Sequence, residues 1–168
     1  MCKFSGVTVH SSYEVNIEWN FEENSHTEFS GVLSFIAKDF ISLPRIAEGV
    51  RIPHVCLFGN STRMAICTAL NGKWNHVWES QEMPLNTWFK LTIKQSRFQA
   101  VNEMEVRSKF IYKILINDLL MHQAINTSPR TFRNVNGYLG TIYLKGEDPQ
   151  SLFAAGKYRN FTFKSESE

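Results

Sequence analysis

Apolar and polar residues alternate along much of this chain. Between Tyr13 and Phe21, for example, Val15, Ile17 and Trp19 occupy one face and polar residues occupy the other. A period of two is typical of a β-strand with one buried face. The same reasoning predicts strands over the ranges 13–21, 29–38, 52–58, 63–70, 74–80, 88–95, 110–116, 119–125, 140–145 and 158–164.

Short turns separate the predicted strands. Asn71-Gly72 and Asn117-Asp118 are hairpin signals, because two-residue hairpin turns need positive φ angles at their central positions. Gly146 to Pro149 is a further turn, whereas residues 96–109 are more charged and less periodic, as expected for a long connection. Regularly spaced short strands with no helix-length segment predict an all-β fold, an antiparallel two-sheet β-sandwich, with a barrel as the related alternative.

The composition is that of one ordinary globular domain. A chain of 168 residues predicts a single domain over residues 1–164, and the closing Ser-Glu-Ser-Glu, residues 165–168, predicts a flexible tail. A net charge of +2 from 18 basic and 16 acidic residues argues against a nucleic-acid partner. No run approaches the roughly 18 apolar residues that cross a bilayer, so no membrane insertion is predicted. The N-terminus lacks the apolar core of a signal peptide, which indicates either an intracellular protein or part of a processed or larger one.

A series of short motifs occurs in one order along the last two thirds of the chain. They are Arg51-Ile52-Pro53, Ile66 to Gly72, Pro84 to Trp88, Ile93 to Gln95, Tyr112 to Ile114, Ile116-Asn117, Pro129 to Val135 and Ala155 to Phe161. In these motifs the chain resembles the laminin-G-like jelly-roll domains of invertebrate extracellular proteins, within the concanavalin A-like lectin/glucanase superfamily. The resemblance implies a jelly-roll sandwich and an extracellular or cell-surface protein. Such domains include lectins, glucanases and cell-adhesion modules, so the fold does not choose among them.

The sequence departs from the family pattern in two loops. Gln150 to Phe153 follow Asp148-Pro149 where aromatic residues are expected, and the segment 96–109 is longer than the pattern. Loops are where binding properties diverge between related domains.

Neither of two carbohydrate-active patterns known on this architecture is complete here. Retaining glucanases carry two carboxylates about 5–5.5 Å apart on one strand, and the nearest match, Glu103 and Glu105, reads better as solvated loop charges. Galectins bind galactosides with a His, an Asn and an Arg on one strand, followed by a Trp and a Glu. The strand His54 to Phe58 lacks the Asn and the Arg, and Trp74 and Glu79 do not have the required spacing. We therefore predict no catalytic residues, no enzyme activity and no galectin-type site.

Trp74, His76 and Trp78 form the best candidate binding feature. On one face of a strand, the indoles could stack on a sugar ring while His76 bonds a hydroxyl group. The alternative is that this face packs on the opposite sheet, which is the commoner position of Trp in a sandwich. Together with the loop residues Asp148 and Phe153, these three residues make up the predicted ligand-binding set.

Cysteine and asparagine positions suggest covalent modifications. A hairpin centred between Ser61 and Thr62 would place Cys56 opposite Cys67, where a disulfide is feasible, and the alternative is two buried reduced thiols. N-glycosylation sequons occur at Asn60, Asn126 and Asn160.

No metal site and no cofactor is predicted. His54, Cys56 and Cys67 lack the fourth ligand of a structural zinc site. Calcium needs several oxygen ligands, and the candidates are scattered over loops, so calcium has no clear motif: Asp118, Asn136, Glu147 and Asp148.

The preferred hypothesis is a non-catalytic recognition module. It would bind a glycan or a protein partner through loops at one edge of the sandwich or through a concave face, in an extracellular or cell-surface protein. The alternative is a structural domain without a small ligand that forms homo-oligomers through its sheet edges. Glycoside hydrolysis is a distant third.

Overall fold

The computed structural model describes residues 2–26, 28–38, 48–98, 109–140 and 155–167. A short 3-10 helix, η2, covers Glu48–Val50. The strands are β1 Cys2–Val9, β2 Ser12–Phe21, β3 Phe29–Ala37, β4 His54–Phe58, β5 Met64–Leu70, β6 Lys73–Glu79, β7 Phe89–Phe98, β8 Lys109–Ile116, β9 Leu119–Asn126, β10 Phe132–Leu139 and β11 Gly156–Glu166.

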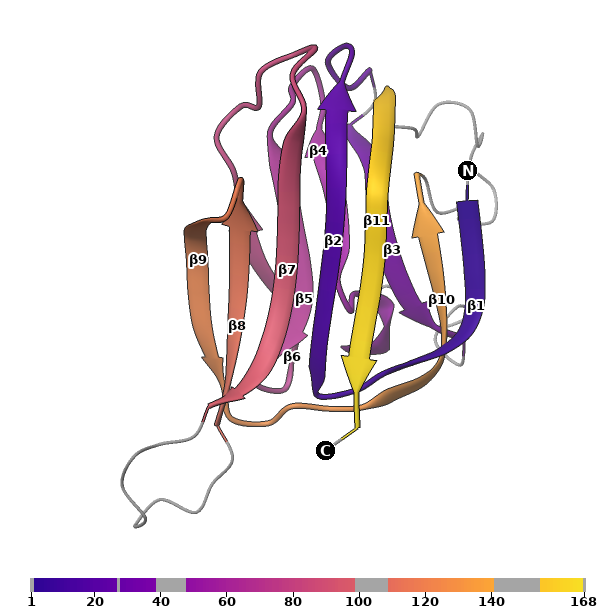
Figure 1. The fold of residues 1–168 in the computed structure, drawn as a ribbon, viewed down its shortest axis with the longest axis vertical. Coiled ribbons are helices and arrows are strands. Elements are labelled where there is room, and N and C mark those ends of the chain that lie inside the picture. The colour runs from indigo at the N-terminus through magenta and orange to yellow at the C-terminus, as the bar shows by residue number, and fades with distance from the viewer. Residues whose placement is uncertain (1, 27, 39–47, 99–108, 141–154, 168) are drawn as a thin grey trace.

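These strands form two antiparallel sheets that pack face to face (Figure 1). The six-stranded sheet has the order β1-β10-β3-β4-β5-β6, and the five-stranded sheet has the order β11-β2-β7-β8-β9. Hairpins join neighbours such as β4 and β5, whereas the pairs β1–β10 and β11–β2 join segments far apart in sequence. The prediction of an all-β, antiparallel two-sheet sandwich is confirmed.

The alternating pattern places the core between the sheets. In β2, the exposed fractions of Val15, Ile17 and Trp19 are 1%, 1% and 2%, while the intervening polar residues face outward. Burying such a side chain contributes about 1.5–3 kcal/mol, so the sequence pattern itself favours this sandwich. Other core residues include Phe21, Leu33, Phe35, Leu57, Ile66, Leu91, Ile93, Tyr112 and Ile114.

Three parts of the fold differ from the predicted elements. β1 and β10 lie outside the predicted strands, and the predicted strand at 140–145 lies outside the described residues. β11 continues through Glu166, two residues past the predicted end of the last strand, because Ser165 pairs with Tyr13 and Glu166 with Ser12. Regular ladder pairing with β2 extends the last strand past the apolar run that suggested its end.

The turns explain both a confirmed and a wrong prediction. Asn71 and Gly72 have φ angles of 53° and 74°, as the predicted hairpin turn requires. The hairpin of β4 and β5, however, pairs His54 with Cys67, and Cys56 pairs with Ala65. Both cysteines are free thiols, so the predicted opposition of Cys56 and Cys67 is wrong and the reduced alternative describes this structure.

Contacts between edge strands join the two sheets at both sides of the sandwich. On one side, Phe4 of β1 meets Phe161 of β11 with ring centroids 5.5 Å apart. On the other side, His76 of β6 meets His122 of β9. The outer faces and the two ends of the sandwich therefore remain as surfaces where a ligand could bind.

Candidate functional site

The strand register aligns a row of side chains across the outer face of the six-stranded sheet. Strand by strand, the row runs through Tyr138, Ser34, His54, Cys67 and Val77. Along its strand, each of these residues has at least one neighbour that lies in the core or packs against it, so the row itself points away from the five-stranded sheet. Ser34 and Cys67 are only 0% and 4% exposed, which makes the middle of this face a floor of small, buried side chains.

Arg51 lies beside this row, just before β4 begins. Its guanidinium carbon is 4.9 Å from the ring centroid of Trp74, and its Nη1 donates a hydrogen bond to Oδ1 of Asn75. The Arg51 side chain also hydrogen-bonds the Cys67 side chain. One extra residue in β6, between its pairs with Thr68 and Leu70, interrupts the alternation there, and Trp74 and Asn75 lie at this irregularity. We call Ser34, Arg51, His54, Cys67, Trp74 and Asn75 the outer-face cluster.

His54 is neutral in this cluster at physiological pH. Burial lowers the pKa of the imidazole from 6.5 to about 4, and the nearby charge of Arg51 acts in the same direction. The Nδ1 atom of His54 is 2.5 Å from Oγ of Ser34, a hydrogen bond that fixes the ring. The cluster thus combines a neutral imidazole, a carboxamide, an indole and a charged guanidinium on one face.

The positions along β4 leave a galectin-type site incomplete. Alternate residues of this strand that share the outer face are His54, Cys56 and Phe58. Where the galectin pattern needs Asn and Arg to follow the His, this strand carries a buried thiol and a half-buried ring that lies under Arg63. Arg51 approaches the same face from outside the strand, so its charge does not occupy the galectin position.

The predicted aromatic set divides between two places. Trp74 belongs to the outer-face cluster, whereas His76 and Trp78 turn inward and lie at the side of the sandwich. Both are half-buried and contact residues of the opposite sheet, Tyr112 and His122, as the packing alternative describes. The predicted loop residues Asp148 and Phe153 lie outside the described residues.

A pair of histidines occupies the side where His76 and Trp78 pack. Nε2 of His76 is 2.9 Å from Nε2 of His122, and Trp78 stacks on His122 with centroids 6.4 Å apart. Burial lowers the pKa of both imidazoles, and for His76 the positive charges of His122 and Lys73 lower it further. The sequence analysis singled out His76 but not His122. A single histidine in a strand pattern does not indicate which residue of the other sheet it will contact.

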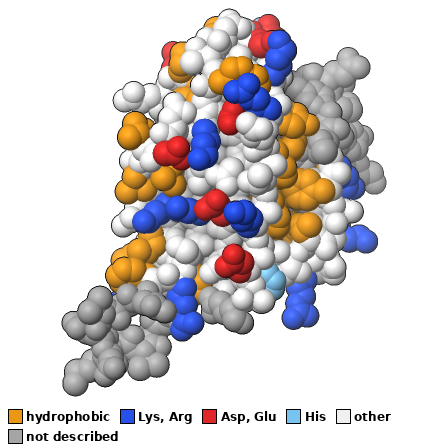
Figure 2. All heavy atoms as spheres, viewed as in Figure 1, with side chains coloured by type: hydrophobic (Ala, Val, Ile, Leu, Met, Phe, Trp, Pro, Cys, Tyr) orange, Lys and Arg blue, Asp and Glu red, His pale blue; other side chains and the backbone are white. Residues whose placement is uncertain are grey.

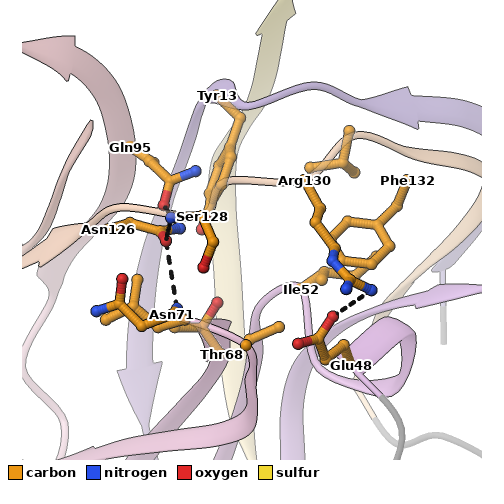
Figure 3. Close-up of a pocket in the computed structure, with 14 residues that line it drawn as sticks. Tyr13, Glu48, Ile52, Thr68, Asn71, Gln95, Asn126, Ser128, Arg130 and Phe132 are labelled. Carbon is orange, nitrogen blue, oxygen red and sulfur yellow. Dashed lines mark hydrogen bonds and ion pairs between the residues drawn. The ribbon is translucent and has the colours of Figure 1, made fainter. Parts of the chain in front are cut away.

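A small polar pocket opens at one end of the sandwich (Figure 3). Its cavity volume is about 20 Å³, which suits a single water molecule and no sugar ring. The side chains that line it already bind one another: Asn126 donates to Oε1 of Gln95 at 2.8 Å, and Glu48 forms an ion pair with Arg130. We therefore assign this end pocket a structural role.

The outer face of the five-stranded sheet is charged but internally compensated. Figure 2 shows acidic and basic side chains next to one another over the middle of this face. Arg159 is 2.7 Å from Glu18, and Lys90 is 2.7 Å from Asp118. A face whose charges are paired offers little net attraction to a charged ligand.

The remaining predictions on modification and metals can be placed on the structure. Asn60 and Asn160 are exposed, whereas the carboxamide of Asn126 is 2% exposed and hydrogen-bonded to Gln95. In the described part of the chain, no three His, Cys, Asp or Glu side chains gather in a way that could hold a metal ion. No helix within those residues has the length and hydrophobicity to span a membrane.

Structural comparison places the chain in a class of folds. A polysaccharide lyase of family 18, aly-SJ02, matches 99% of this chain and 79% of its own, with a TM-score of 0.55 and 10% identity. A double variant of human galectin-16 matches 98% of this chain and 95% of its own, with a TM-score of 0.52 and 12% identity. No family model and no curated protein matches the sequence. The chain therefore shares the jelly-roll β-sandwich fold of these two structures, which is the fold that the resemblance predicted.

The prediction that the chain is not an enzyme is contradicted by this comparison. The polysaccharide lyase shares its fold with 99% of this chain, at a TM-score of 0.55. The prediction rested on a missing pair of glycosidase carboxylates, which concerns hydrolysis alone. Neither the fold nor that missing pair excludes catalysis by other chemistry.

Proposed function

We propose that the chain recognises carbohydrate through the outer-face cluster of the six-stranded sheet. The observation that carries the proposal is the convergence of Arg51, His54, Trp74 and Asn75 from separate segments onto one face. Binding sites typically combine an apolar or aromatic surface with a few polar groups in fixed positions. Sugars present both C–H faces and hydroxyl edges, so an indole beside planar polar groups suits them.

The similar structures support this proposal in general terms. They include a galectin and a polysaccharide lyase. The fold thus occurs among carbohydrate-directed proteins, while the residues of this chain decide where a sugar would bind.

A comparison of two tryptophans tests the proposal. Trp74 and Trp88 are both half-buried and both lie under an arginine. Trp74 is in β6 of the six-stranded sheet, whereas Trp88 immediately precedes β7 of the five-stranded sheet. We expect a glycan array to detect binding by the wild-type chain and by Trp88→Ala, and we expect Trp74→Ala to lose it. Equal binding by both variants, with circular dichroism confirming that they fold, would place the sugar elsewhere.

A second candidate function, self-association, is favoured by one edge strand. β9 is the outermost strand of the five-stranded sheet, and Leu119, Leu120, Met121 and Ile125 on it are 46–69% exposed. An apolar edge strand with free backbone groups is a ready partner for another strand. Sedimentation over a range of protein concentrations should then show a dimer that Leu120→Lys abolishes, whereas a constant monomer mass would eliminate this function.

A further inference from the structure

Three arginines of the described chain lie over aromatic rings. They are Arg51 on Trp74, Arg63 on Phe58 and Arg159 on Trp88, at 4.9, 4.8 and 4.1 Å from the ring centroids. Arg63 also forms an ion pair with Glu79 at 2.8 Å, and Arg159 forms one with Glu18 at 2.7 Å. Within the described residues, no carboxylate pairs with Arg51. Two of these charges are thus neutralised locally and the third is not.

The described side chains that contact Arg51 are neutral. Its partners are the carboxamide of Asn75 and the thiol of Cys67, and the adjacent His54 carries no charge at physiological pH. β6 contains one acidic residue, Glu79, and its carboxylate forms an ion pair with Arg63. A guanidinium has five N–H donors and cannot lose its charge in a protein. Arg51 therefore keeps its charge, and the described residues occupy only some of its donors.

Packing fixes the guanidinium of Arg51 in place. The indole of Trp74 lies against one side of the group and Asn75 accepts from one of its nitrogens. A planar guanidinium held in this way loses little conformational entropy when it binds an anion, and its fork of donors matches a carboxylate or a sulfate. The guanidinium thus lies over one face of the Trp74 indole.

We propose that the outer-face cluster selects acidic saccharides, with Arg51 binding a uronate carboxylate or a sulfate ester. His54 and Asn75 would bond the neighbouring hydroxyl groups. This inference rests on the proposed carbohydrate-binding function and specifies its ligand class. The inference also agrees with the presence of Cys56 and Phe58 where a galectin has polar residues. A saccharide that Arg51 binds through its negative charge needs fewer polar side chains along β4.

Matched ligands and matched variants test the inference. The wild-type chain is titrated by calorimetry with oligouronates, with sulfated oligosaccharides, and with their carboxyl-reduced and desulfated counterparts. We expect binding of at least one acidic series, which identifies the anion, and little binding of its neutral counterpart. Arg51→Gln should weaken that binding by about 10- to 100-fold, the range for losing a charge-assisted hydrogen bond. Arg63→Gln, which removes a stacked but already paired arginine, should change it by less than about 3-fold.

The possible failures are distinguishable. Binding of the neutral counterparts with unchanged affinity in Arg51→Gln would overturn the acidic selectivity and leave the carbohydrate-binding function intact. Equal losses in Arg51→Gln and Arg63→Gln would show that general positive charge, and not this cluster, attracts the ligand. No binding of any saccharide by the folded chain would overturn both the inference and the function on which it rests.

Discussion

Replacing His54 with glutamine should remove a specific part of the pH dependence of stability. The folded chain holds this imidazole neutral until the pH approaches its lowered pKa of about 4, whereas the unfolded chain binds a proton near the ordinary pKa of 6.5. Stability from this group is therefore complete above pH 6.5 and is lost as the pH falls toward 4. Linkage gives a loss of about 2 kcal/mol by pH 5 and about 3 kcal/mol in full. Glutamine does not titrate and can still hydrogen-bond Ser34.

Urea unfolding of the wild-type chain and of His54→Gln at pH 7 and pH 5 measures this difference directly. The wild-type chain should lose about 2 kcal/mol more than the variant between these two pH values. His76 and His122 titrate in both proteins, so their contribution cancels in the comparison. Equal losses in the two proteins would refute the assignment of a half-buried, neutral His54 and weaken the account of the outer-face cluster.

Three further predictions concern stability and reactivity. Phe35 is fully buried and contacts other aromatic rings, so Phe35→Ala should destabilise the chain by about 3–5 kcal/mol in denaturant titrations. A Cβ on Gly137 would lie 1.9 Å from the ring of Phe4, so Gly137→Ala should cost about 1–3 kcal/mol. The added cost should shrink in a Phe4→Ala background, and additive costs would disprove the clash. Burial raises the pKa of the Cys56 thiol to about 12, so the native chain contains almost no reactive thiolate at this position. In a variant whose other cysteines are replaced by serine, a thiol reagent should therefore react only after unfolding. Rapid labelling of the native chain would contradict this.

The sequence predicts most strands because their patterns match their surroundings. One face of β2 is fully buried, and the alternation of apolar and polar residues along its sequence predicts such a strand directly. β1 is harder to recognise, because its pairing with β10 is interrupted by two register shifts and Gly6 has a φ angle of 74°. Bulges interrupt the alternation that a strand prediction depends on.

The predicted pairing of Cys56 with Cys67 was wrong because the centre of the β4–β5 turn was placed one residue too far along the chain. The amide of Phe58 bonds the carbonyl of Arg63, so the hairpin closes on residues 59–62, with Asn60 at a φ angle of 55°. A centre one residue closer to the N-terminus moves the partner of Cys67 from Cys56 to His54. The turn geometry determines the register of a hairpin. This sequence is compatible with several loop lengths, so the register could not be predicted from it.

The candidate site was only partly accessible to sequence reasoning. Trp74 was a candidate because of its residue type. Arg51 and Asn75 became candidates only because the fold brings them into contact with each other and with Trp74. Their contact depends on an irregularity in β6 that a strict period of two does not anticipate. The enzyme prediction failed for another reason, since it tested one reaction class and generalised to all.

The positions of the two outermost strands also determine how the domain would respond to force. β1 and β11 lie at the same side of the sandwich, in different sheets, and in Figure 1 the start of β1 and the end of β11 point toward opposite ends of the long axis. Tension applied between these points runs along the strands and loads the β1–β10 and β11–β2 ladders in shear, with many hydrogen bonds resisting together. We expect a single-molecule pulling experiment to show high rupture forces in this direction. Pulling across the strands, from β6 and β1, should separate them pair by pair at lower force, and equal forces in both directions would contradict this mechanical reading.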